Sequence, residues 1–234
     1  SSNAGKAVVQ AVLEDREEQL LERFQNKFPG KIERPQLPVI PLPIGTEQIR
    51  QALPTKNFAR KKLGLNTHSH VVLWLGRLSM LTKLDPWRTY LVLQKAALAL
   101  KKPLILIECG PDDTSHQALH FERLRSLCPN VQFLRVGGDQ PVSESIKFDC
   151  MAAADIAVSL VDNTQETFGL AVAEAMAAGL PVVASDWNGY KDLVRNGIDG
   201  FLIPTQWSSL AEDLASRLGW ASSLGVMSYP IAAG

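Results

Sequence analysis

Residues 155–205 read DIAVSLVDNTQETFGLAVAEAMAAGLPVVASDWNGYKDLVRNGIDGFLIPT, and this stretch decides the fold. An apolar run at 156–160 predicts a buried strand, and a polar loop at 163–167 follows it. An Ala-rich segment at 169–179 predicts a helix, and 181–185 predict a second buried strand. A strand, a loop, a helix and a strand make one βαβ unit, and such units build parallel sheets.

The joint between this loop and this helix is the candidate site. Gly169 has no Cβ, so a ligand can approach its backbone closely. The free N–H groups at a helix start favour an anion such as phosphate. Glu166 precedes the joint and Glu174 lies inside the helix, and a carboxylate accepts hydrogen bonds from vicinal hydroxyls. The joint could therefore hold a phosphate between two rings that carry hydroxyls.

The rest of the chain continues the alternation of strands and helices. Strands are predicted at 70–76, 104–108 and 131–134, and helices at 57–65, 87–101, 116–128, 144–153 and 207–218. This order predicts an α/β fold with a Rossmann-like, doubly wound parallel sheet, which binds its ligand at the carboxyl ends of the strands.

Four segments are expected along the chain. Apolar positions at helical spacing predict a helix in 1–28. Five prolines in 29–45 favour an extended linker with a short strand at 37–40, although a surface loop within one domain is the alternative. The sheet domain covers 46–220, and 221–234 is an irregular tail.

Composition narrows the class of protein. The 234 residues carry no formal net charge, and nothing in the charge pattern indicates a nucleic-acid partner. Cys109, Cys128 and Cys150 are interpreted as reduced core thiols in a cytoplasmic protein. No apolar run reaches the roughly 20 residues that span a bilayer, and peripheral contact with the inner membrane face stays open.

The sequence resembles family-4 retaining glycosyltransferases of the GT-B fold. Glu166 and Glu174, with seven residues between them and AMAAGLPVVAS after them, resemble the E-x7-E signature of that family. The string GYKDLVRNGIDGFLIPT resembles the segment that comes after the signature in the same family, and the resemblance covers residues 39–218. It implies transfer of a sugar from a nucleotide diphosphate sugar to an acceptor hydroxyl, with retention of configuration.

The resemblance also implies roles for single residues. Glu166 would bind hydroxyls of the transferred sugar and Glu174 the ribose hydroxyls. Backbone N–H groups of Phe168, Gly169 and Leu170 would contact the sugar and the diphosphate.

Two cations after the first strand, Arg77 and Lys83, resemble the Gly-Arg-x-x-x-x-Lys pattern of the family, although five residues separate them here. They would neutralise the diphosphate and stabilise its charge as it leaves. The base would rest on backbone groups after the 131–134 strand, which points to Arg135 and Val136. No metal or other cofactor is expected, although His116 and His120 are spaced as a metal pair.

The resemblance further implies that the chain is the C-terminal, nucleotide-sugar-binding half of the enzyme. Residues 1–28 would then be a helix left from the N-terminal domain, which would hold the acceptor site. We therefore expect the chain alone to bind donor weakly and to transfer nothing. A non-catalytic nucleotide-binding or assembly module is the alternative. A sugar-nucleotide epimerase would need its own acid–base residues, and none is evident.

Overall fold

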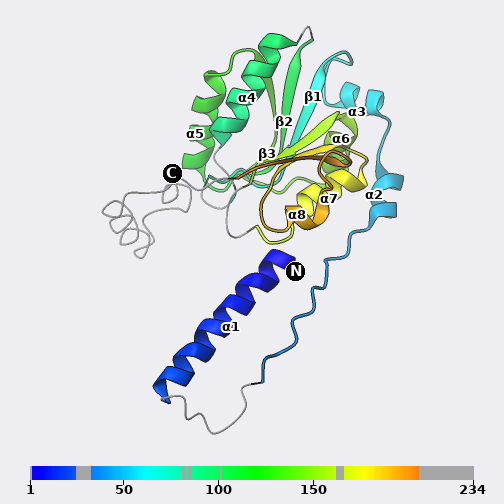
Figure 1. The fold of residues 1–234 in the computed structure, drawn as a ribbon. Coiled ribbons are helices and arrows are strands. Elements are labelled where there is room, and N and C mark those ends of the chain that lie inside the picture. The colour runs from blue at the N-terminus through cyan, green and yellow to red at the C-terminus, as the bar shows by residue number, and fades with distance from the viewer. Residues whose placement is uncertain are drawn as a thin grey trace.

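A six-stranded parallel sheet forms the centre of the protein in the computed structural model (Figure 1). The structure describes residues 2–24, 33–80, 83, 86–100, 102–161 and 166–205. The strands are β1 (His70–Leu75), β2 (Leu104–Pro111), β3 (Val131–Gly138), β4 (Ile156–Ser159), β5 (Val182–Ser185) and β6 (Gly200–Ile203). Their order is β3-β2-β1-β4-β5-β6, so the winding reverses between β1 and β4. Sheets of this kind bind ligands at the carboxyl ends of the strands beside that reversal.

Helices cover both faces of the sheet. They are α2 (Thr46–Ala52), α3 (Lys56–Lys62), α4 (Pro86–Ala99), α5 (Ser115–Ser126), α6 (Glu144–Ala153), α7 (Leu170–Ala177) and α8 (Tyr190–Leu193). Figure 1 shows α4 and α5 on one face and α2, α3, α6 and α7 on the other. The prediction of a Rossmann-like, doubly wound parallel sheet is therefore confirmed.

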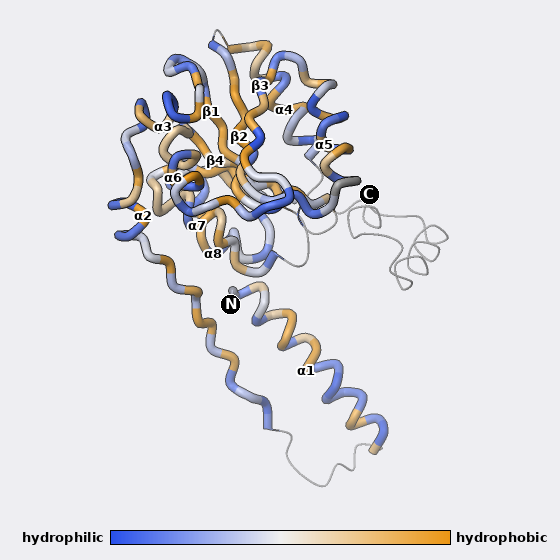
Figure 2. The backbone as a smooth tube through the Cα atoms, turned by 180° about the vertical axis from the view of Figure 1, so that it is seen from behind, coloured by the Kyte–Doolittle hydropathy of each residue, from blue (hydrophilic) through white to orange (hydrophobic). Residues whose placement is uncertain are grey.

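Strands β1 and β2 are apolar along nearly their whole length, because helices cover both of their faces. Val71, Leu73 and Leu106 are fully buried, and Figure 2 shows the hydrophobic colour along β1. The exception is Glu108 in the middle of β2, which is also fully buried. Its carboxylate accepts a hydrogen bond from the Tyr90 hydroxyl of α4 and pairs with Arg125 of α5 at 2.7 Å. One buried charge thus ties two helices to the sheet.

The N-terminal helix leads away from the sheet domain. It is α1 (Asn3–Arg23), whose N-cap Ser2 accepts a hydrogen bond from the Gly5 N–H, and none of its residues is buried. Asn3 bonds Asp192 of α8, and Figures 1 and 2 show the rest of α1 projecting from the body beside the extended chain of 33–45. The helix was predicted within 1–28, of which 25–28 lie outside the described residues.

The predicted strand at 37–40 was wrong. Residues 33–45 are extended but belong to no sheet. Prolines lack the N–H that a strand ladder needs. The predicted helix at 207–218 and the tail at 221–234 lie outside the described residues.

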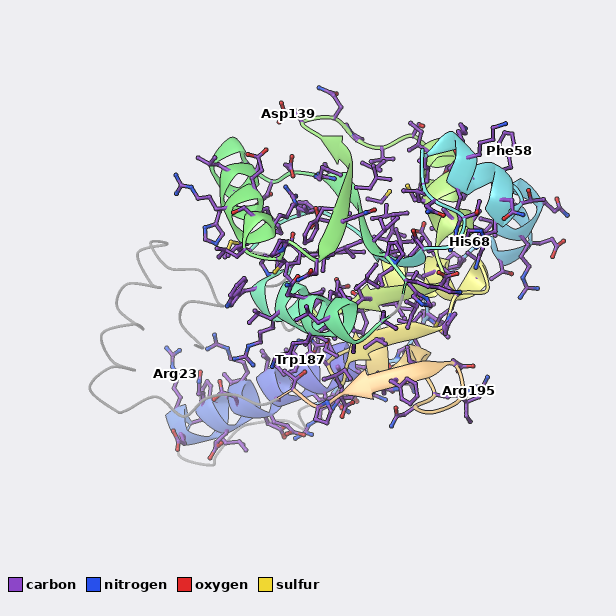
Figure 3. The ribbon with its side chains drawn as sticks, turned by 90° about the horizontal axis from the view of Figure 1, so that it is seen from above. Arg23, Phe58, His68, Asp139, Trp187 and Arg195 are labelled. Atoms are coloured by element: carbon purple, nitrogen blue, oxygen red, sulfur yellow. The ribbon has the colours of Figure 1, made fainter. Side chains whose placement is uncertain are left out.

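The sequence does not predict α2, α8 or β6, and two strands extend beyond their predicted ends. β2 and β3 stay paired as far as Pro111 and Gly138, and Figure 3 labels Asp139 just beyond the end of β3. Glycines allow this, since a Cβ on Gly137 would lie only 2.1 Å from the Gly110 carbonyl oxygen. Arg135 and Val136 were expected in a loop after the strand, and they lie within it.

Among the described parts of the chain, no helix has both the length and the apolar character that a membrane crossing requires. All three cysteines are buried and none forms a disulfide.

Candidate functional site

The site lies where the carboxyl ends of β1 and β4 meet the start of α7. Lys83 follows β1, and its Nζ lies 2.7 Å from Oε2 of Glu166. The other carboxylate oxygen of Glu166 accepts a hydrogen bond from the Gly169 N–H at 3.1 Å. The Glu166 side chain is 14% exposed and that of Lys83 30%. The structure therefore brings three predicted site residues together despite the additional residue between Arg77 and Lys83.

A tight contact fixes the backbone at the start of α7. Gly169 has φ +90°, a left-handed conformation that favours glycine, and a Cβ there would lie 2.4 Å from the Tyr190 ring. Tyr190 is buried, and its hydroxyl lies 2.8 Å from the Ser159 hydroxyl at the end of β4. Burial raises the pKa of Tyr190, and the charge of Glu166 adds to the effect.

Tyr190 is a site residue that the sequence analysis missed. It lies 21 positions after Gly169 in the chain, within GYKDL, and nothing in that string points back to the helix start. Its neighbour Gly189 makes a second close approach, since a Cβ there would lie 2.3 Å from the Thr167 carbonyl oxygen. The end of the loop that carries Glu166 is thus packed in close contact with the start of α8.

The two residues that flank Gly169 differ in exposure. Phe168 is buried, whereas Leu170, the first residue of α7, is exposed. Burial of Phe168 anchors the loop, and Leu170 faces solvent at the start of α7. The first N–H groups of a helix have no partner within the helix and favour an anion.

Arg77 lies beside the loop that follows β2. Its Nη1 is 3.5 Å from Oδ1 of Asp113, and its side chain is 50% exposed. The other oxygen of Asp113 accepts hydrogen bonds from the Ser79 hydroxyl at 2.8 Å and from the Gln117 amide at 3.1 Å. Asp113 thus joins the loops after β1 and β2, and the exposed guanidinium is available to a ligand.

Glu174 projects from α7 toward α6. One of its carboxylate oxygens lies 2.8 Å from Nζ of Lys147, and the two side chains are 27% and 22% exposed. Lys147 was not among the predicted site residues. Its position in the second turn of a helix with charged neighbours is typical of a solvated surface lysine.

Arg135 holds the carboxyl ends of β2 and β3 together. Its guanidinium donates to the carbonyl oxygens of Glu108, Val136 and Gly110 at 2.6–2.9 Å and pairs with Asp112 at 2.9 Å. The side chain therefore supports the strand ends. A contact between the base and the backbone of Arg135 or Val136 stays a prediction.

No group of three or more His, Cys, Asp or Glu side chains within the described ranges is arranged to hold a metal ion. The cations at the site, Arg77 and Lys83, are the groups that could meet a phosphate.

Comparison with known proteins gives the family. Residues 69–219 match the family described as "Glycosyl transferases group 1". A D-inositol 3-phosphate glycosyltransferase of Thermobispora bispora is 27% identical over an alignment of 190 residues, and the match covers 72% of this chain and 44% of that protein. An enzyme of the same name from Thermomonospora curvata is 32% identical over 147 residues, 62% of this chain and 33% of that protein.

Solved structures share the fold. A glycosyltransferase from Rickettsia africae ESF-5 has a TM-score of 0.50 at 19% identity, covering 77% of this chain and 45% of that chain. The chain spans less than half the length of each of these three proteins. Since the family match extends over most of the sheet domain and more than half of the sequence, this chain belongs to the group 1 glycosyltransferases.

Proposed function

We propose that this chain is the donor-binding half of a retaining glycosyltransferase that transfers a sugar from a nucleotide diphosphate sugar to an acceptor hydroxyl. Membership of the glycosyltransferase family supports the reaction class. The greater length of the curated relatives supports a second half that is not in this sequence.

The observation that carries the proposal is the cluster of Lys83, Glu166 and Gly169 at the winding reversal of the sheet. An ammonium group and a helix start favour the diphosphate of the donor, and the adjacent carboxylate favours the hydroxyls of its sugar. Because Glu166 is bonded to the helix start, the sugar and the diphosphate would be held next to each other.

The chemistry follows from this arrangement. The bond between the anomeric carbon and the diphosphate oxygen breaks, and its electron pair leaves with the diphosphate. The acceptor oxygen forms the new bond to that carbon, and its proton passes to the departing diphosphate oxygen. Lys83 would leave Glu166 for the departing diphosphate, and Arg77 would leave Asp113, so that both stabilise the charge as it develops. Neither role needs a bound metal or other cofactor.

The remaining assignments concern the nucleotide. Glu174 would bind the ribose hydroxyls, and backbone groups of Arg135 and Val136 would contact the base. Backbone groups of Phe168, Gly169 and Leu170 would face the sugar and the diphosphate. The clamp of Tyr190 on Gly169 keeps those backbone groups in a fixed position.

We propose the same domain organisation as the sequence indicates. Residues 46–220 form the donor domain, 29–45 the linker, and 1–28 a helix of the acceptor-side domain. The exposed apolar side chains of α1, which include Val8, Val12 and Leu20, support a role in contacting further protein.

Calorimetric titration of the chain with UDP, GDP and ADP tests the proposal. We expect one nucleotide to bind and Glu174→Ala to weaken it. Arg195→Ala is the control, since Arg195 is exposed and pairs with Asp199 just before β6. If no nucleotide binds, or if both variants weaken binding equally, the donor site is refuted.

An assay for sugar transfer separates the proposed enzyme half from the alternative of a non-catalytic module. We expect no transfer by the chain alone and transfer by a full-length protein that also contains an acceptor domain. A full-length protein that binds nucleotide but transfers nothing would favour the module.

A further inference from the structure

Each carboxylate of the E-x7-E pattern is paired with a lysine from another element. Glu166 meets Lys83 of the loop after β1, and Glu174 meets Lys147 of α6. We infer that Lys147 is a positioning residue, which orients Glu174 so that its carboxylate receives the ribose hydroxyls of the donor. The inference rests on the proposed function and adds to it a residue that determines preference for ribose.

The helix that carries Lys147 is fixed at its start and on its opposite side. Its backbone N–H donates to the carbonyl of Ser143, whose side chain caps α6. The far side of α6 is tied to α3, because Lys62 Nζ lies 2.6 Å from Asp149. The Lys147 ammonium is 2.8 Å from Glu174, and both side chains are partly buried. A partly buried ion pair is screened less by salt than an exposed one.

The pair joins α7 to α6, which packs against β1 and β2. Cys109 lies near the end of β2, and its neighbour in β3 is Val136. The pKa of the Cys109 thiol is lowered first by a hydrogen bond from Cys150 and, against the effect of burial, by the charges of Arg135 and Lys147. By geometry, α6 carries Lys147 against β2, the strand beside β3, and the base is proposed to lie at the end of β3.

The geometry leaves Glu174 able to serve a ribose. An ionised carboxylate has about four acceptor positions, and Lys147 occupies one of them on a single oxygen. The second oxygen remains for the two vicinal hydroxyls. Without Lys147 the carboxylate would sample several rotamers, and part of the affinity for those hydroxyls would be lost to ordering it.

The test compares a nucleotide with its 2′-deoxy form. UDP, GDP or ADP, whichever binds the chain tightest, is titrated beside dUDP, dGDP or dADP. For the unaltered chain we expect the ribonucleotide to bind about tenfold tighter, which is the effect of one hydrogen bond to a charged group. In Lys147→Met we expect the two affinities to lie within about twofold of each other, and Lys147→Arg to restore most of the difference.

Lys62→Met is the matched control. It also removes a lysine that pairs with a carboxylate, but Lys62 belongs to α3 and its partner Asp149 lies on the side of α6 that faces α3. We expect it to retain the full difference between the ribonucleotide and the deoxynucleotide. Thermal unfolding of every variant shows which are folded, and a loss confined to the ribose preference cannot come from a general loss of stability.

The outcomes separate the two proposals. Loss of the preference in Lys147→Met alone supports the inference. Retention of the preference in Lys147→Met, or equal loss in Lys62→Met, overturns it and leaves the donor site standing. If the unaltered chain binds nucleotides without preferring ribose, Glu174 does not read the ribose and the inference fails. If it binds no nucleotide, the proposed function fails first and the inference fails with it.

Discussion

At the scale of single residues, the start of α7 depends on a glycine that cannot be replaced without strain. Gly169 is left-handed and in close contact with the Tyr190 ring, and the Glu166 carboxylate is bonded to its N–H. These two neighbours therefore fix both the position and the left-handed conformation of Gly169. Any side chain at 169 would disturb the backbone that is proposed to face the diphosphate.

Gly169→Ala is expected to lower the free energy of unfolding by about 3 kcal/mol, from backbone strain and overpacking together. Gly179→Ala is the matched control, because Gly179 is also left-handed at φ +81° but a Cβ there would meet no atom within 4 Å. It should cost only about 1 kcal/mol. Urea unfolding of both variants measures the difference, and equal losses would contradict the role given to Tyr190.

Lys83→Met is expected to weaken binding of a nucleoside diphosphate about tenfold, since a charge-assisted contact to phosphate is lost. Binding of the corresponding nucleoside, which has no phosphate, should change little. Calorimetry at low and at high salt checks the cause, because the difference between Lys83→Met and the unaltered chain should shrink as salt rises. If Lys83→Met weakens binding of the nucleoside as much as binding of the nucleoside diphosphate, Lys83 does not contact the phosphates.

The sequence could predict the two glutamates and the glycine because they lie within nine residues of one another. Lys83 was predicted as a site residue, but neither its pairing with Glu166 nor the pairing of Lys147 with Glu174 could be predicted in the same way. Lys83 is 83 residues from Glu166, and Lys147 is 27 residues from Glu174. Such pairs form only when the sheet brings β1, α6 and α7 together, so they depend on tertiary structure that no local pattern encodes.

At the scale of elements, apolar runs and helical periodicity predicted the elements that build the core. Two short elements could not be predicted, for physical reasons. Helix α8 has only four residues, which are too few to show a helical period, and β6 begins with a glycine that packs against β5. The ends of β2 and β3 were placed too early because glycines usually end a strand. Here they let the strands continue, since their neighbours leave no room for a side chain.

The buried carboxylate that ties α4 and α5 to β2 should be sensitive to the loss of one partner. Arg125→Met leaves Glu108 charged and buried, and we expect a loss of about 3 kcal/mol in the free energy of unfolding. Replacing the whole cluster, with Glu108→Leu, Arg125→Met and Tyr90→Phe, should recover most of that loss. Chemical denaturation measures both, and a triple variant less stable than the single one would contradict the explanation.

At the scale of the whole molecule, charged residues near the amino ends of the strands join segments that are far apart in the chain. Asp155, at the start of β4, bonds Lys56 and Arg60 of α3 and the Val71 N–H of β1. This end of the sheet lies opposite the candidate site. Its bonds therefore stabilise the domain and do not take part in binding.

These bonds predict how stability depends on pH. Burial raises the pKa of Asp155, but the hydrogen bonds from Lys56 and Val71 and the two nearby cations outweigh it, so the pKa is lowered overall. Because the pKa of Asp155 is lower in the folded protein than in the unfolded protein, its charge stabilises the fold. This stabilisation is fully present above the pKa of the unfolded protein, about 3.9, and is lost as the pH falls through the pKa of the folded protein.

Asp155→Asn is therefore expected to cost about 2 kcal/mol at neutral pH, with a smaller cost below about pH 4. Unfolding of both proteins from pH 7 to pH 3 measures the convergence. Lys56 and the carboxylate are partly exposed, which limits the size of the effect. A difference that does not change with pH would show that the charge of Asp155 is not the cause.

The strand order also affects how the chain is made. β1 is at the centre of the sheet, yet the segment that covers its second edge begins 84 residues later along the chain. Since a ribosome adds about 5–20 residues per second, β4 is synthesised roughly 4–17 seconds after β1, and the second edge of β1 is unpaired during that time. During this interval an apolar strand with unpaired backbone groups can join a strand of another chain. The step most exposed to aggregation is thus set by translation speed between β1 and β4, and slower synthesis of that stretch would prolong it.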